Sequence, residues 1–489
     1  MATSRLQEVI IGAKERSKEI KKLEKQGLIK KIAPRVYTSS LGETPEKIIQ
    51  RNWFRILSGL YPEALLSHRS ALERKPTSHG HVYLTYTYTD NIELPGLHIH
   101  FLKGPAPLVP DDENFFGPLK ASSLARAYLE NLQSSRGSGE QSKALSRKEL
   151  EEKMELFLRV KGEDALNQVR DKAKELAPKL GMEKEERTLN QLITDMLGTG
   201  LSTNLVSQAA KARVLGEPFD GDRIGLFESL YQNLVEREYP DYKDKNESPK
   251  SYQNFAFFEG YFSNYIEGTE FTVEEAKQII TTNTPLPARD EDSHDVLGTY
   301  QIVSNRREMK MRPKDANDLI KLIKERHAIL LSARKSKNPG EFKDRNNRAG
   351  NTEFVDWQLV TGTLKKGYDW YALLQHPFAK AAYMMFMISE VHPFLDGNGR
   401  IARVMMNVEL GANNLSKIII PTVYREDYLG TLKKLTKQRD ADAYIRMLLR
   451  AWEFSASIYS DNLDAMERLL IDSNAFLLPK DGYLKILRR

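Results

Sequence analysis

The sequence predicts a mainly α protein, with a helical C-terminal core preceded by a winged helix-turn-helix, a small strand-rich segment and a helical spacer. Three observations predict this fold class. Apolar residues recur at helical spacing over most of the chain beyond residue 118. The alternation that is typical of strands is concentrated in residues 81–110. The N-terminal segment has the order basic helix, glycine, and two short apolar stretches around an Ala-Pro-Arg turn, which favours a winged helix-turn-helix.

The composition limits the class of protein. The chain has 489 residues, of which 40% are hydrophobic and 29% charged, as in ordinary soluble proteins. It has no cysteine, which excludes disulfides and thiolate metal sites and fits a reducing cytosol. No apolar run approaches the length of a membrane span. We therefore expect a cytoplasmic protein with no membrane partner.

The predicted parts follow the shifts in pattern along the chain. Residues 1–60 are expected to form the winged helix-turn-helix, and residues 61–117 a small α+β segment. Residues 118–239 are expected to form the spacer, and residues 240–489 the helical core.

The excess of basic residues lies at the N-terminus. The net charge is +6; residues 1–35 carry ten Lys or Arg and four Glu, and the rest of the chain carries 63 of each sign. Residues 4–26 are rich in helix formers, and short strands are expected at residues 28–32 and 36–38. If this module binds DNA, the phosphate contacts are expected from Lys21, Lys22, Lys25, Lys30, Lys31 and Arg35. The alternative is a winged helix used for protein contacts, with the charge as a solvated face.

Two stretches of this half carry a family resemblance. Residues 21–37 look like the N-terminal module of AbiEi-type antitoxin regulators, and residues 63–72 resemble the segment that follows it. The resemblance implies a bacterial DNA-binding regulator of a toxin–antitoxin kind.

Residues 81–110 contain two alternating stretches, 81–88 and 97–102, with turn signals at Asp90-Asn91 and Pro95-Gly96 between them. His98 and His100 lie two apart, on one face of the second strand. A metal site is one interpretation of this pair. No carboxylate or third histidine accompanies it at ligand spacing, so exposed strand histidines are the favoured interpretation.

Residues 118–235 favour helices, with amphipathic patterns at 121–132, 149–158 and 164–176. The Gly- and Ser-rich residues 134–142 predict a loop. No motif connects this block to chemistry, and we interpret it as a spacer between two working modules.

The most informative stretch of the core is His392-Pro-Phe-Leu-Asp-Gly-Asn-Gly-Arg-Ile-Ala-Arg403. His392 is a candidate proton acceptor, and Asp396 is a hard oxygen ligand suited to Mg²⁺. The Gly-Asn-Gly sequence allows close approach of the backbone to a ligand, at the start of a helix where free N–H groups favour an anion. Arg400 and Arg403 lie three apart on one helix face and offer two guanidinium groups to phosphate.

Every position of this stretch matches the motif of the Fic family, H-x-F-x-D/E-G-N-G/K-R-x-x-R. The resemblance implies a helical Fic core and transfer of a nucleoside monophosphate, usually AMP from ATP, to a hydroxyl of a target protein. It implies that His392 deprotonates the target Ser, Thr or Tyr and that Asp396 holds Mg²⁺ on the α- and β-phosphates. The nucleotide-binding residues that it implies are Phe394, Gly397, Asn398, Gly399, Arg400, Arg403 and Tyr428.

The resemblance also bears on the donor nucleotide. The kinase-like branch of the family has Lys where this chain has Gly399, so the resemblance favours nucleotidyl transfer over phosphorylation. The motif residues chiefly handle phosphate and metal. Use of UTP or GTP, and removal of the modification, therefore remain open alternatives.

A second match lies upstream, in a helix expected over residues 254–268. It ends in Ser263-Asn-Tyr-Ile-Glu-Gly268, which matches the inhibitory motif of Fic proteins, S/T-x-x-x-E-G/N. The resemblance implies that Glu267 forms a salt bridge with Arg403 and withholds it from the γ-phosphate, as in the Fic class whose inhibitory helix precedes the core. The alternative is a helix C-cap at Gly268, and the two interpretations are compatible.

The rest of the core is expected to be helical, at residues 293–306, 314–331 and 379–389. A capping box at Thr272 opens a further helix. Residues 339–350 interrupt the periodicity, where the resemblance implies a β-hairpin flap that docks the target. The methionines of residues 379–389 favour buried core over a pliable binding surface.

We therefore expect an ATP- and Mg²⁺-dependent protein adenylyltransferase, inhibited by Glu267, that modifies a protein target or itself. The alternative is a DNA-binding regulator of a toxin–antitoxin kind, in which the Fic domain is a sensor or is inactive. The target, the operator sequence and the oligomeric state are not encoded in any pattern that we recognise.

Overall fold

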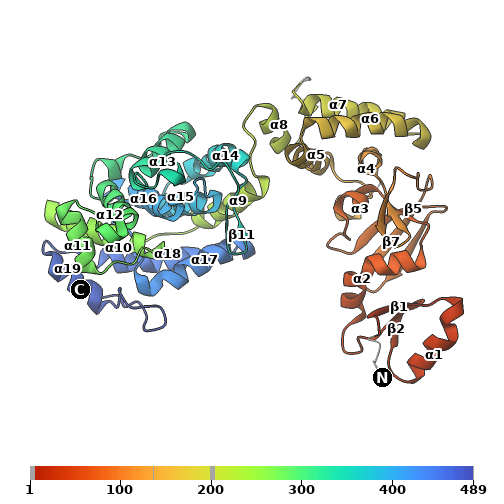
Figure 1. Cartoon of the computed structure of the whole chain (residues 1–489), viewed down its shortest axis with the longest axis horizontal. Helices are drawn as coiled ribbons and strands as arrows, with labels where there is room; N and C mark the ends of the chain where they lie inside the picture. The colour runs from red at the N-terminus through yellow and green to blue at the C-terminus, as the bar shows by residue number, and fades with distance from the viewer. Residues whose placement is uncertain (1–5, 136, 199–203, 488–489) are drawn as a thin grey trace. The chain divides into compact units, whose positions relative to one another are not determined.

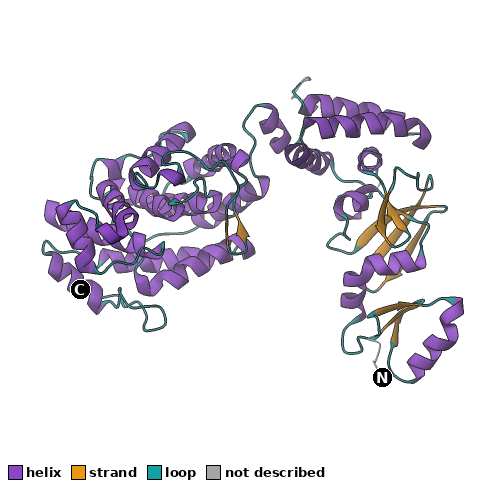
Figure 2. Cartoon of the chain, in the orientation of Figure 1, coloured by secondary structure: helices purple, strands orange, loops and turns teal. Residues whose placement is uncertain are grey.

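The computed structural model describes residues 6–135, 137–198 and 204–487. It divides the chain into two units, residues 1–215 and 216–489 (Figure 1). The chain is mainly helical, as predicted, and its strands lie in the first unit apart from one short hairpin (Figure 2). Within the described residues, no helix combines the length and the apolar character needed to cross a bilayer.

The N-terminal sheet corrects one prediction. The helix expected over residues 4–26 begins only at α1 (Ser17–Lys25), because β1 (Val9–Ile11) forms an edge strand. Its β-branched residues suit a strand, and it pairs with β3 (Val36–Thr38), which in turn pairs with β2 (Lys30–Ala33). The two strands expected around the Ala-Pro-Arg turn are confirmed. Within the described residues 6–33, a single α-helix precedes this hairpin, so the helix pair of a helix-turn-helix is not seen there.

A six-stranded sheet forms the middle of the first unit, in the order β6-β7-β5-β4-β9-β8. Its strands are β4 (Leu65–Leu66), β5 (His81–Tyr86), β6 (Asp90–Leu94), β7 (Leu97–Lys103), β8 (Glu113–Phe116) and β9 (Leu119–Ala121). The turn expected at Asp90-Asn91 is wrong, because β6 begins there and pairs along β7. The Pro95-Gly96 turn closes that hairpin, with Gly96 at φ +72°.

The two strand histidines lie on this sheet. His98 and His100 are half-buried, and His98 pairs with Glu93 of β6. His100 Nε2 lies 2.9 Å from Nδ1 of His81 on β5, a contact that only the sheet register brings about. Among the described residues, no group of His, Asp and Glu is arranged to hold a metal ion.

Helices complete the first unit, and the three patterns predicted in residues 121–176 are confirmed. The helices are α2 (Pro45–Leu60), α3 (His68–Glu73), α4 (Leu124–Asn131), α5 (Arg147–Lys161), α6 (Glu163–Leu180), α7 (Glu183–Met196) and α8 (Gln208–Val214). The loop expected at residues 134–142 contains one short 3-10 turn, and its Arg136 lies outside the described residues.

The second unit begins ahead of the boundary expected at residue 240, because α9 packs into its core through Phe227. Its elements are α9 (Gly221–Val235), α10 (Pro249–Ile266), α11 (Val273–Thr282), α12 (Asp290–Val303), α13 (Ala316–Leu330), β10 (Arg348–Ala349), β11 (Thr352–Glu353), α14 (Val360–Leu373), α15 (Pro377–Val391), α16 (Asn398–Ala412), α17 (Arg425–Gln438), α18 (Ala441–Ala456) and α19 (Leu463–Asp472). The hairpin expected at residues 339–350 lies later, at residues 348–353.

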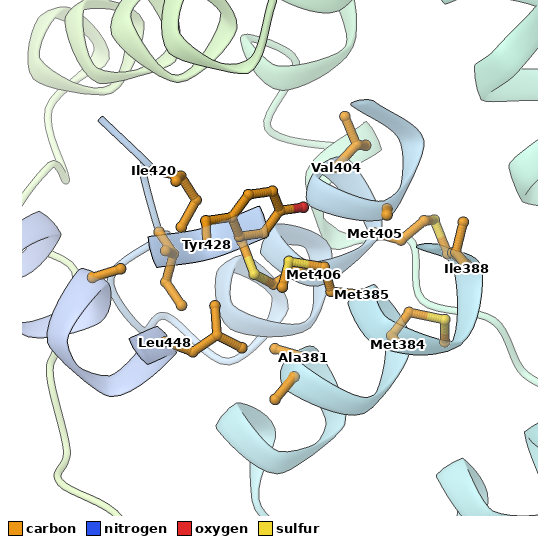
Figure 3. Close-up of a cluster of buried hydrophobic side chains, with 14 of the residues drawn as sticks. Ala381, Met384, Met385, Ile388, Val404, Met405, Met406, Ile420, Tyr428 and Leu448 are labelled. Carbon is orange, nitrogen blue, oxygen red and sulfur yellow. The ribbon is translucent and has the colours of Figure 1, made fainter. Parts of the chain in front are cut away.

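The core of this unit is built around α15 and α16. The methionines of α15 are fully buried, so the prediction of core is confirmed. Figure 3 shows Met384 and Met385 of α15 with Met405 and Met406 of α16, alongside Tyr428 of α17. This packing fixes the two helix ends between which the motif residues lie.

Candidate active site

The motif joins the end of α15 to the start of α16. His392 has a left-handed conformation, φ +52°, and its N–H donates to the Ile388 carbonyl, which ends α15. Gly397 has φ +74° and precedes the first residue of α16. A side chain at Gly397 would be strained by that φ and would lie against Leu331. The first N–H groups of α16 thus lie beside the loop, a place that suits an anion.

Side chains beneath the loop hold its shape. The side-chain amide of Asn398 accepts a hydrogen bond from the Phe394 N–H at 2.8 Å. The same amide donates a hydrogen bond to the Phe394 backbone carbonyl at 2.9 Å. The Phe394 ring is fully buried and stacks on His327, with centroids 3.8 Å apart. His327 Nε2 lies 3.1 Å from the Asp396 carbonyl. The protein's own side chains therefore hold the loop in this conformation.

His392 has a defined tautomer. Its Nδ1 lies 3.1 Å from the Ser389 carbonyl, and a carbonyl can only accept, so Nδ1 carries the proton and Nε2 the lone pair. The ring stacks on Phe354, just past β11, with centroids 3.6 Å apart. Burial lowers the pKa of His392 to about 4, and the Lys343 ammonium acts in the same direction. The imidazole is therefore neutral at pH 7.

Lys343 is a buried amine that motif matching missed. It lies in the segment before the hairpin, and its Nζ donates to the Asn347 side chain at 2.7 Å. Burial lowers its pKa to about 8. Its backbone N–H donates to the Pro393 carbonyl at 2.8 Å, which ties this segment to the motif.

Arg403 is buried and fully engaged by α10 and α17. Its Nε donates to Ser263 Oγ at 3.0 Å, and its Nη2 donates to the Ser263 carbonyl at 2.8 Å and to Glu267 Oε1 at 2.7 Å. Nη1 lies 3.3 Å from the hydroxyl of the buried Tyr428. The pairing of Glu267 with Arg403 that the sequence suggested is present in the structure.

Glu267 stands at the end of α10, before Gly268 at φ +93°. Burial alone would raise the pKa of Glu267, but the Arg403 guanidinium outweighs it and lowers that pKa below its ordinary value. A side chain at Gly399 would clash with Glu267 Oε1. The carboxylate therefore lies directly against the glycine of the motif, above the start of α16.

Arg400 has different partners from Arg403. Its Nη1 pairs with Asp295 of α12 at 2.6 Å, with both side chains buried, and lies 3.3 Å from the side-chain oxygen Oδ1 of Asn264. Asp396 lies 3.7 Å from Nη2 and remains 37% exposed. The Asp396 Oδ1 accepts from the Gly397 N–H at 2.7 Å.

A cavity of about 220 Å³ lies beside His392 and Arg403, and neither Arg400 nor Asp396 is among the residues that line it. Its lining includes Glu267, His392, Gly399, Arg403, Tyr428 and residues of α17 from Leu429 to Thr436. Phe354 and Thr352 of the hairpin also border it. The arrangement brings a neutral imidazole, the N-terminus of a helix and a guanidinium to one small space.

Arg223 of α9 contacts the hairpin through its guanidinium group. Its Nη2 donates to the Glu353 carbonyl at 2.6 Å, and its Nε lies 3.0 Å from the buried carboxylate of Glu390. Thr436 donates to the other oxygen of Glu390 at 2.6 Å. Glu353 directly precedes Phe354, so Arg223 fixes the ring that covers His392.

The basic residues of the N-terminal module differ in whether their side chains are already hydrogen-bonded to the protein. Lys30 donates to the carbonyls of Leu41 and Glu43, and Arg35 donates to the Gly12 carbonyl. The other candidates are exposed and, in the described structure, have no carboxylate partner: Lys21, Lys22, Lys25 and Lys31.

Comparison with known protein families finds a match over the segment that contains this site. Residues 318–410 match the Fic/DOC family, so the chain contains a Fic domain. The "Protein adenylyltransferase Fic" of Drosophila willistoni is 26% identical over 215 residues, which are 41% of this chain and 40% of that protein. The protein of the same name from Drosophila melanogaster is 26% identical over 210 residues, 41% of each chain. The chain thus spans about two fifths of the length of these relatives.

Two solved structures resemble parts of the chain at low similarity. A Fic-domain-containing signaling protein from Bacteroides thetaiotaomicron has a TM-score of 0.37 and 20% identity, over 50% of this chain and 97% of that one. Fic-1 from C. elegans has a TM-score of 0.36 and 16% identity, over 68% of this chain and 89% of that one.

Proposed function

We propose that this chain, which carries a Fic domain, is a protein adenylyltransferase that is inhibited by its own Glu267. It transfers AMP from ATP to a Ser, Thr or Tyr hydroxyl of a target protein, or of itself. The observation that carries the proposal is the position of the Glu267 carboxylate, against Gly399 and paired with Arg403. A carboxylate in this position competes with a phosphate for the same guanidinium.

In the proposed reaction, the histidine of the motif takes the proton and the residues at the start of α16 bind the phosphates. Nε2 of His392 accepts the proton of the target hydroxyl, and the oxygen of that hydroxyl attacks the α-phosphorus of ATP. A new P–O bond forms, the bond to the bridging oxygen between the α- and β-phosphorus breaks, and pyrophosphate leaves. The N–H groups at the start of α16 and the Arg400 guanidinium stabilise the charge that develops on the phosphate oxygens. Arg403 binds the γ-phosphate once Glu267 has moved away.

Asp396 fits a role as the protein ligand of Mg²⁺. One of its oxygens accepts from Gly397, and the exposed carboxylate is free to bind a cation through the other oxygen. Mg²⁺ is usually held by one or two carboxylates, with substrate phosphates and water completing the shell, so one Asp suffices. When bound, the ion neutralises charge on the phosphates.

The test compares wild type with Glu267→Gly and His392→Ala, each incubated with Mg²⁺ and α-labelled ATP and then analysed by intact mass. We expect weak labelling of wild type, and a gain of about tenfold or more in Glu267→Gly, because Arg403 becomes available. Adding His392→Ala to Glu267→Gly should lower transfer by about 10²–10⁴-fold. Parallel reactions with UTP and GTP identify the donor nucleotide.

Glu270→Gly is the matched control. Glu270 lies three residues further along, and its carboxylate pairs with no cation in the described structure. Equal gains in Glu267→Gly and Glu270→Gly would mean that loosening of this segment, and not release of Arg403, raises transfer. Labelling that survives His392→Ala would contradict the role of the histidine.

A second candidate function is DNA binding by the N-terminal module. The observation that favours it is the row of Lys21, Lys22 and Lys25 on α1, which are exposed and have no carboxylate partner among the described residues. Such lysines supply the salt-dependent, sequence-independent part of DNA affinity. The two functions are compatible because they involve different units.

A further inference from the structure

A second cavity lies in the Fic-bearing unit, among residues that neither the motif nor the proposed function uses. It has a volume of about 760 Å³, against 220 Å³ for the cavity beside His392. Its walls are the segment 310–314, one face of α13, and parts of α14 and α15. The cations that line it are Lys310, Arg312, Lys314, Lys321 and Lys380. The only carboxylates in this lining are Asp318 and Glu325.

Within the described residues, four of these five cations form no ion pair. Arg312 and Lys314 are exposed, and neither forms an ion pair in the part of the chain that the structure describes. Lys310 donates to the Asn414 side chain, and Lys380 Nζ lies 5.1 Å over the ring of Tyr371. Lys321 reaches Glu325 only at 3.9 Å, with both side chains exposed. Basic side chains on a convex, solvated surface are normally directed away from one another. Here the five basic side chains line a single concave cavity.

The segment that carries Arg312 and Lys314 is held in place by its backbone. Arg326 is buried and donates to the Met311 carbonyl at 2.9 Å. The Tyr368 hydroxyl donates to the Pro313 carbonyl at 3.1 Å, and Asp318 accepts from the Lys314 N–H at 3.0 Å. The cations are therefore presented by a fixed loop, which lowers the entropy cost of binding a ligand.

Two tyrosines lie at the floor of the cavity, and a buried carboxyl lies behind one of them. Tyr371 donates to Glu409 at 2.5 Å from beneath. Burial raises the pKa of Glu409, against the opposing effects of the Tyr371 hydrogen bond and of the charges on Arg312 and Lys380. Tyr368 adds a half-exposed ring to the lining, whereas Tyr371 is buried.

We propose that this cavity binds a small polyphosphate-bearing anion, at a site distinct from the one beside His392. The size is that of small-molecule sites, and cations on three of its sides suit a compact multivalent anion. Arginine binds phosphate through its fork and lysine as a point charge. The half-exposed ring of Tyr368 offers a stacking surface if the anion carries a base.

The test is calorimetric titration of the full chain with inorganic tripolyphosphate at low salt. We expect Arg312→Glu/Lys314→Glu to bind about tenfold more weakly or worse. Lys480→Glu/Lys485→Glu is the matched control, because it changes the net charge equally at two exposed lysines outside the cavity. The control and Arg403→Ala should each bind within about threefold of wild type.

Two results would overturn the proposal: equal loss in the charge-reversed pair and in its control, or loss of the binding in Arg403→Ala alone, which would place the anion beside His392. Thermal melting checks the fold, and Arg312→Gln/Lys314→Gln is the milder variant if the reversed pair is destabilised. A parallel titration with ATP distinguishes the ligand source. Tighter binding of ATP than of tripolyphosphate means that the nucleoside is recognised, and equal binding means that the phosphates suffice.

Discussion

Two regions of this chain offer cations to phosphate, and they differ in burial. On α1, Lys21, Lys22 and Lys25 are exposed and have no carboxylate partner among the described residues. On α16, Arg400 and Arg403 are buried, and each guanidinium already binds protein carboxylate and carbonyl oxygens. The lysines of the first region are open to an anion directly, whereas the arginines of the second are open to one only by exchange for a partner that the protein supplies.

This difference separates two kinds of control. Exposed lysines interact through water, so salt screens them and each contributes little. A buried arginine that loses its carboxylate partner is left as an uncompensated charge. Release of that carboxylate is therefore favourable only when another anion takes its place. Regulation by competition is therefore available on α16 and not on α1. Four predictions follow from the comparison, in order of decreasing effect.

The largest effect is expected at the Asp295–Arg400 pair. Asp295→Ala leaves the Arg400 guanidinium buried, with Asp396 no closer than 3.7 Å, and it also removes a partner of Arg334. We expect a loss of about 3–5 kcal/mol in the free energy of unfolding of this unit, measured by urea denaturation. Asp369→Ala, which breaks the exposed pair with Lys366, is the control and should cost less than about 1 kcal/mol. Similar losses in both variants would show that burial does not distinguish the pairs.

The pH dependence of transfer should reflect the burial of His392. The folded pKa of His392 is lowered to about 4, so the imidazole is already neutral at pH 5 and its neutral fraction changes little between pH 5.5 and 8. We expect the transfer rate of Glu267→Gly to be nearly flat over that range and to fall only as the pH approaches 4. A histidine with an ordinary pKa near 6.5 would lose about tenfold between pH 8 and 5.5. A tenfold fall in that interval would contradict the assigned environment.

The sequence alone is enough to predict that the motif residues lie together, because they are neighbours in the chain. One loop and one helix turn place His392, Asn398 and Arg403 together, whatever the rest of the fold. Glu267 could also be predicted, since a short pattern ends its helix at Gly268. Asp295 could not, because it comes from α12, more than a hundred residues from Arg400, and no local pattern marks it.

The errors in the fold have a related cause. Val9–Ile11 lies in a segment rich in helix formers, yet its pairing with β3 makes it a strand. Phe354 and Lys343 flank His392 only because the hairpin segment folds back over α15. Local propensity predicts elements, but contacts between distant segments follow from packing, which a single sequence does not show.

A smaller effect is expected from Arg223, which reaches the site from outside the matched Fic segment. Arg223→Ala, in the Glu267→Gly background, should free the hairpin and lower kcat by about tenfold with little change in the KM for ATP, because Arg223 touches Glu353 and Glu390 and no motif residue. Arg223→Lys should restore part of the rate. Arg237→Ala, which removes an ion pair with Asp442 just past the end of α9, is the control. An effect on KM alone would show that Arg223 acts on nucleotide binding instead.

The smallest effect is expected on α1. Replacing Lys21, Lys22 and Lys25 with Gln should lower the affinity for a 30-base-pair DNA duplex only several-fold at physiological salt, because each exposed lysine contributes weakly. The slope of log affinity against log salt should become shallower by about 0.9 for each lysine that contacts a phosphate. Lys30→Gln is a useful comparison, since Lys30 is already bound to the Leu41 and Glu43 carbonyls and should change the slope less. If the triple variant keeps the slope of wild type, these three lysines form a solvated face and contact no phosphate.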